Sequence, residues 1–80
     1  MISILNAESM RDPKFLATLG ARIRKIRSEK SISQIALATM CEFEKASMSR
    51  IESGRTNPTV LTLKKISNAL EVHISDLLKD

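Results

Sequence analysis

A helix over residues 45–53 would place four side chains together on one face: Lys45, Ala46, Ser49 and Arg50. This face spans about 140° when successive residues are set about 100° apart. Arg50 can bind O6 and N7 of a guanine through two parallel hydrogen bonds, and Lys45 can reach a guanine or a phosphate. Ser49 can hydrogen-bond to several bases, and Ala46 can contact the methyl group of a thymine. The pattern therefore predicts a face with the chemistry to bind base edges.

A second, shorter helix must hold this face in position. Ser33 can cap a helix over residues 34–40, and residues 41–44 can turn the chain into the helix over 45–53. Two helices that cross steeply need apolar contacts, with a small residue at the closest approach. The residues expected to supply these contacts are Leu37, Ala38, Cys41, Phe43, Met48 and Ile51. A helix-turn-helix over residues 33–53 is predicted.

The remaining elements are also helical by their spacing. Asp12 and Pro13 predict the start of a helix that runs to about Glu29. Thr59 can cap a further helix, and a short last helix should carry Leu77 and Leu78. The residues expected to face inward from the helix after Thr59 are Val60, Leu63, Ile66 and Leu70. We expect an all-α, compact five-helix domain over residues 12–80, preceded by a partly ordered N-terminal arm over residues 1–11.

Composition narrows the classes of function. The 80 residues carry a formal net charge of +4, which suits a polyanionic partner but is also common on small soluble domains. The single cysteine, Cys41, fits a reducing cytoplasm, and no apolar run is long enough for a membrane span. No nucleophile–base pair, carboxylate dyad, phosphate loop or metal-ligand spacing is present. We expect a cytoplasmic protein that is no enzyme, with no cofactor, metal or small-molecule substrate.

Four segments together resemble the helix-turn-helix family of phage repressors, Cro proteins and Xre-type regulators. They are LGARIRKIR from Leu19, SQIALA from Ser33, MSRIESGRTNP from Met48 and TLKKISNAL from Thr62. The resemblance runs without a gap from Leu19 to Leu78. The four segments together are specific to this family, whereas any one of them alone would be weak evidence for it. It implies a repressor-like DNA-binding domain that regulates transcription.

The resemblance implies a role for individual residues. The base-contacting positions match Lys45, Ala46, Ser49 and Arg50, and the positions that contact the DNA backbone match Gln34, Arg55, Thr56 and Asn57. Arg27 and Glu52 match a buried salt bridge between the first and third helices. A homodimer is expected to place two reading helices in successive major grooves about 34 Å apart on a pseudo-palindromic operator. The candidates for its dimer surface are Val72, Ile74, Leu77 and Leu78, although some of these residues must close the core.

Three residues depart from the family pattern. Glu42 stands where glycine is usual, and a left-handed conformation there costs about 1 kcal/mol. Glu44 stands where Ser or Thr usually caps the reading helix, and Glu71 where glycine is common. Glu42 and Glu44 favour an alternative function, an antitoxin-like or adaptor module that binds another protein. DNA binding that depends on salt and on DNA sequence would distinguish a transcriptional regulator from a protein-binding module.

Several other features have ordinary explanations. Cys41 is expected in the core, and His73, with no partner at useful spacing, at a helix cap or on the surface. Ile35 is apolar where the family is commonly acidic, and we expect the apolar residues of the arm, Ile2, Ile4 and Leu5, to cover it or a partner subunit. The operator, the sign of regulation and the biological system stay open, the last among a restriction-modification controller, a phage or mobile-element switch and an autoregulator.

Overall fold

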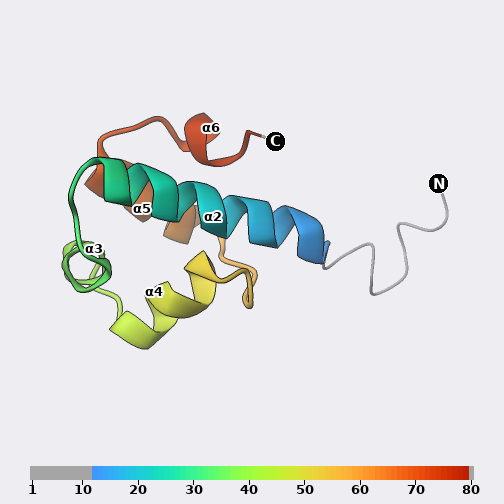
Figure 1. The fold of residues 1–80 in the computed structure, drawn as a ribbon, viewed down its shortest axis with the longest axis horizontal. Coiled ribbons are helices and arrows are strands. Elements are labelled where there is room, and N and C mark those ends of the chain that lie inside the picture. Colours follow the sequence, from blue (N-terminus) through green and yellow to red (C-terminus); the bar gives the residue numbers. More distant parts are fainter. Residues whose placement is uncertain (1–11, 80) are drawn as a thin grey trace, which may run out of the picture.

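The computed structural model describes residues 12–79, which form five helices and no strand (Figure 1). The helices are α2 (Pro13–Glu29), α3 (Gln34–Met40), α4 (Lys45–Glu52), α5 (Val60–Leu70) and α6 (Ile74–Leu77). The predicted all-α architecture is confirmed. The expected arm over residues 1–11, including the contact of Ile2, Ile4 and Leu5 with Ile35, lies outside the described residues.

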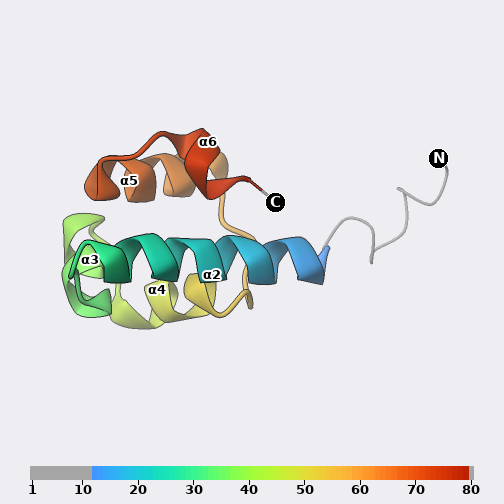
Figure 2. The ribbon, with the colours of Figure 1, turned by 45° about the horizontal axis from the view of Figure 1, so that its top comes forward.

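The long helix α2 is the spine of the domain. Figure 2 shows α2 between two pairs of helices, with α3 and α4 on one side and α5 and α6 on the other. Asp12 caps α2 by accepting a hydrogen bond from the Phe15 N–H at 3.1 Å, and Ser33 and Thr59 cap α3 and α5 in the same way. All three caps follow the prediction from sequence.

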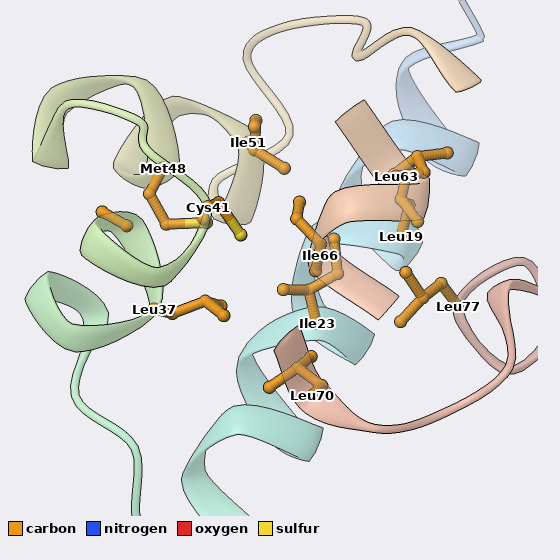
Figure 3. Packing of buried hydrophobic residues seen from close by; sticks show 11 residues of the cluster. Leu19, Ile23, Leu37, Cys41, Met48, Ile51, Leu63, Ile66, Leu70 and Leu77 are labelled. Atoms are coloured by element: carbon orange, nitrogen blue, oxygen red, sulfur yellow. The ribbon is translucent and has the colours of Figure 1, made fainter. Parts of the chain in front are cut away.

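The core fills the space between the two pairs of helices (Figure 3). Its fully buried apolar side chains are Ile23, Leu37, Met48, Ile66, Leu70 and Leu77. Ala38, Cys41 and Ile51 are also buried, and Phe43 packs against the core from the turn. These contacts confirm the apolar positions predicted for the helix-turn-helix.

Two expectations at the edges of the core are wrong. Val60 was expected to face inward, but it is 75% exposed, because it lies in the first turn of α5 and about 70° off the centre of the buried stripe. Leu78 was expected within the last helix, but α6 ends at Leu77 and Leu78 is 40% exposed. The reading helix also ends one residue early, at Glu52, with Ser53 as its C-cap.

Gly20 permits the close approach of α2 and α4. A Cβ atom at this position would lie 2.4 Å from the backbone oxygen of Glu52 and 2.5 Å from that of Ile51. Such contacts are shorter than any that backbone atoms tolerate, so only glycine fits between the two helices. This constraint is not visible in the periodicity of α2.

A buried carboxylate fixes α4 to the rest of the domain. Arg27 donates to Glu52 twice, from Nε to Oε2 at 2.7 Å and from Nη2 to Oε1 at 3.0 Å. Its Nη1 donates to the Ile32 carbonyl oxygen at 2.9 Å. Glu52 is only 3% exposed, so the predicted salt bridge between α2 and α4 is confirmed and has the bidentate geometry that guanidinium groups favour.

Two further side chains reach the same carboxylate. Gln34 Nε2 donates to Glu52 Oε1 at 3.0 Å, and Arg24 Nε lies 3.5 Å from the same oxygen. We call these four residues, Arg24, Arg27, Gln34 and Glu52, the Glu52 hub. Burial raises the pKa of Glu52, but the hydrogen bonds from Arg27 and Gln34 and the charge of Arg27 outweigh it, so the pKa lies below its usual value.

Glu52→Gln should lower the free energy of unfolding at neutral pH by about 3 kcal/mol, because it leaves the largely buried Arg27 charge without its partner. Urea unfolding measures the effect, and Glu29→Gln, which removes an exposed carboxylate, is the control.

The same carboxylate should make stability depend on pH. A carboxyl group whose pKa is lowered by folding stabilises the folded state above its unfolded pKa, and this stabilisation is lost as pH falls through the folded pKa. The wild-type protein should therefore lose more stability on acidification than Glu52→Gln. Equal, small losses for both variants at neutral pH would contradict this role of the hub.

The turn between α3 and α4 contains a left-handed glutamate. Glu42 has φ 60°, and this conformation lets the Phe43 N–H donate to the Ala38 carbonyl oxygen at 2.8 Å. A side chain with a Cβ atom is strained there, as the sequence predicted. The apolar contacts on either side of the turn therefore stabilise it against the strain at Glu42.

Glu42→Gly should raise the free energy of unfolding by about 0.5–1 kcal/mol, since relief of the strain exceeds the added entropy of the unfolded chain. Thermal or urea unfolding checks the gain. Glu29→Gly removes the same charge from a right-handed helical position and should instead destabilise the protein. The strain would be refuted if both variants shifted stability in the same direction.

Candidate nucleic-acid interface

The predicted base-contacting residues lie together on the outer side of α4. Lys45, Ala46 and Arg50 are exposed and Ser49 is half-buried, while Met48 and Ile51 point into the core (Figure 3). The side chains that hold the helix and those that it presents are thus on opposite sides. We call Lys45, Ala46, Ser49 and Arg50 the reading face.

Arg50 has most of its donors available. Its Nη2 donates to Ser47 Oγ at 3.3 Å, which uses one of the five N–H groups of the guanidinium. The contact lies one turn away along the same helix and steadies the side chain without covering it. Arg50 therefore has the geometry to form a bidentate contact with a ligand outside the protein.

A shallow groove of about 310 Å³ joins the reading face to the loop after it. Arg50 and Ser47 line one wall, and the rest of the lining comes from Phe43, Ile51, Thr56, Asn57, Pro58, Thr59 and Thr62. The fold thus brings the predicted backbone-contacting Thr56 and Asn57 beside Arg50. Ser47, Thr59 and Thr62 were not predicted at the site, because the groove forms only where α4, the loop after it and the first turn of α5 come together.

The loop over residues 53–58 is anchored to the end of α4. Gly54 has φ 76°, a left-handed conformation that glycine adopts without strain, and the Arg55 N–H donates to the Arg50 carbonyl oxygen at 2.9 Å. The Arg55 side chain donates from Nε to Ser53 Oγ at 3.0 Å. Arg55 and Asn57 are exposed and Thr56 is half-buried, so the loop presents polar groups next to the groove.

Gln34 has a different setting from that expected. It was predicted as a contact with the DNA backbone, and the structure places its amide nitrogen on Glu52. An amide NH₂ group has two hydrogens, so one donor still points away from the hub. Gln34 is half-buried at the first position of α3, where it links the hub to the surface.

Acidic side chains flank the start of the reading helix. Glu44 is the N-cap of α4, is exposed and makes no side-chain cap hydrogen bond, which confirms the poor cap predicted from sequence. Glu42 is exposed two residues earlier. Both carboxylates repel phosphate groups, so they disfavour a close approach of DNA at this end of α4.

Cys41 and His73 have structural roles. Cys41 is 3% exposed, and its burial raises the pKa of the thiol although the charge of Lys65 opposes the shift. His73 is exposed at the N-cap of α6, where its backbone N–H donates to Asp76 Oδ2 at 3.2 Å. Both placements confirm the expectation.

Two kinds of feature are absent from the part of the chain that the structure describes. Within residues 12–79 there is no group of three or more His, Cys, Asp or Glu side chains that could hold a metal ion. Over the same residues no helix combines the length and the apolar character that crossing a membrane requires.

Comparisons with known proteins agree with this geometry. The model of the helix-turn-helix family matches residues 23–77. The immunity repressor of Bacillus phage phi105 is 33% identical over 61 residues, which are 76% of this chain and 42% of the repressor. The control protein C.BamHI of Bacillus amyloliquefaciens is 42% identical over 60 residues, 74% of each protein. The chain thus spans less than half of the phage protein but most of the control protein.

Solved structures give the same result. The restriction-modification controller protein C.AhdI from Aeromonas hydrophila has a TM-score of 0.76 and 27% identity, over 78% of this chain and 94% of that chain. The clp gene regulator ClgR from Corynebacterium glutamicum has a TM-score of 0.77 and 26% identity, over 80% and 83% of the two chains. Since the family match also covers more than half of the sequence, the chain belongs to the Xre-type helix-turn-helix family of DNA-binding transcriptional regulators, which is not a family of enzymes.

Proposed function

We propose that the protein is a homodimeric transcriptional regulator that binds a pseudo-palindromic operator by inserting α4 into the major groove. The observation that carries this proposal is the reading face, exposed on one side of α4 and held from behind by the core and the Glu52 hub. Lys45, Ala46, Ser49 and Arg50 match the donors and apolar contacts that base edges accept. Such a protein works in the cytoplasm, on the DNA of the nucleoid.

Contacts with the DNA backbone set the depth and register of the reading helix in this proposal. Thr56 and Asn57 line the shared groove with Arg50, Arg55 precedes them in the same loop, and Gln34 lies at the start of α3. These residues come from both ends of the helix-turn-helix. Phosphates on either side of the major groove are therefore within the span of one domain.

Dimerisation is supported by an apolar surface on α5 and the residue after α6. Val60 and Leu61 are 75% and 68% exposed, and Leu78 is 40% exposed. Leu77, the residue before Leu78, packs toward Leu63 of α5 in the core (Figure 3). We call Val60, Leu61 and Leu78 the apolar patch.

The apolar patch replaces most of the dimer surface expected from sequence. Leu77 is fully buried, and Val72 and Ile74 are half-buried against the core. Only Leu78 of the four expected residues is free to meet a partner. A second copy related by two-fold symmetry would cover the same patch on both chains and set the spacing of the two reading helices.

Arg50→Ala should weaken binding to selected operator sites by about 1–3 kcal/mol and relax the preference at one base pair in each half-site. The sites are obtained by selecting bound sequences from random DNA with the wild-type protein, and affinities are then measured at fixed salt. An equal loss on operator and random DNA would make Arg50 a phosphate contact. Failure to select any DNA sequence would reject the proposed function and favour a protein-binding module around Glu42 and Glu44.

Leu61→Glu should raise the dissociation constant of the dimer at least about tenfold, since a charge would enter an apolar interface and tenfold corresponds to about 1.4 kcal/mol. Sedimentation at micromolar concentration measures the change. Ile35→Glu is the matched control, because Ile35 is a similarly exposed apolar residue, 59% exposed, on α3. A wild-type protein that stays monomeric with and without operator would contradict the dimer.

A further inference from the structure

Arg24 occupies an unusual place at the edge of the hub. Its Nε lies 3.5 Å from Glu52 Oε1, the oxygen that also accepts the hydrogen bond from Gln34 Nε2. Its side chain is nevertheless 59% exposed, whereas that of Arg27 is 13% exposed. Arg24 is thus held beside Gln34 at the surface where α2, α3 and α4 meet.

The charges of the hub do not balance. One carboxylate faces two guanidinium groups, so a surplus of one positive charge is left at this surface. Arg27 uses Nε, Nη1 and Nη2 on Glu52 and Ile32. Among residues 12–79, Arg24 makes only the one long contact through Nε, so both of its Nη groups are available and the surplus charge resides on Arg24.

We propose that Arg24 binds a DNA phosphate, and that Glu52 holds Arg24 and Gln34 side by side so that both donate to the same phosphate group. This inference rests on the proposed function. The planar guanidinium presents two parallel N–H donors that match two phosphate oxygens. The remaining hydrogen of the Gln34 amide supplies a third donor.

The other cations of α2 have a different setting. Lys25 and Arg22 line a hollow on α2 with Thr18 and Ala21, without any residue of α3 or α4. Lys25 is exposed like Arg24 but lies about 100° further around the helix. Lys25 is therefore a matched control, with the same charge and helix but no contact with the hub.

The experiment measures binding of the full chain to selected operator DNA over a series of salt concentrations. Arg24→Gln should lower the slope of log affinity against log salt by about 1.8, because the dimer loses two phosphate contacts, one per half-site, at about 0.9 each. It should also weaken binding of the dimer to operator and to random DNA by the same factor. Lys25→Gln should leave the slope close to that of the wild-type protein. Thermal unfolding of both variants checks that each is folded.

A second pair of measurements locates the phosphate. Replacing single phosphates of the operator with neutral methylphosphonates should reveal one position per half-site that weakens binding of the wild-type protein much more than binding of Arg24→Gln. Arg24→Lys keeps the charge and should keep the wild-type slope. Equal slopes for Arg24→Gln and Lys25→Gln, with steep salt dependence in the wild-type protein, would overturn the inference alone. A wild-type protein without salt-dependent DNA binding would reject the proposed function itself.

Discussion

The ion pair between Arg27 and Glu52 is the interaction on which the arrangement of α4 depends. A helix of eight residues is too short to be stable alone, so its direction is set by its attachments. Met48 and Ile51 fix one side of α4 in the core, but apolar contacts tolerate sliding and rotation more readily than a bidentate hydrogen bond does. The carboxylate joins α4 to α2 through Arg27 and to α3 through Gln34. All three helices that bear on the reading face are therefore tied to one buried group.

This design separates support from recognition within two turns of helix. Every strong side-chain contact of α4 lies on its inner side or at its end, and within residues 12–79 the weak bond from Arg50 to Ser47 is the only hydrogen bond made by the side chain of a reading-face residue. The outer residues are consequently under little structural constraint. Because Lys45 and Ala46 are exposed and Ser49 is half-buried, we expect substitutions at these positions to have little effect on the fold.

The sequence predicted the parts of the fold that local rules determine. The caps at Asp12, Ser33 and Thr59, the inward stripe of each helix and the strained turn at Glu42 all follow from neighbouring residues. Val60 was misplaced because its spacing fits the stripe of α5, while its burial depends on whether another element covers the first turn. Leu78 was misplaced because helix ends are weakly marked in the sequence.

The site was predicted unevenly for the same physical reason. The reading face follows from the helical repeat, and the salt bridge was identified only through the family resemblance. The contacts of Arg24 and Gln34 with Glu52, and the place of Ser47, Thr59 and Thr62 around the groove, join segments that are distant in the chain. No local pattern encodes such contacts. The net charge of the chain also gives no indication that one buried carboxylate faces two guanidinium groups.

Gly20 has a consequence beyond the packing of two helices. The backbone of α4 rests against a position that has only a hydrogen atom, so the distance between the axes of α2 and α4 is at its lower limit there. The contact with α2 at Gly20 therefore sets how far α4 protrudes from the domain. In this protein the height of α4 above its scaffold is determined by the residue with the smallest side chain, at the contact between α2 and α4.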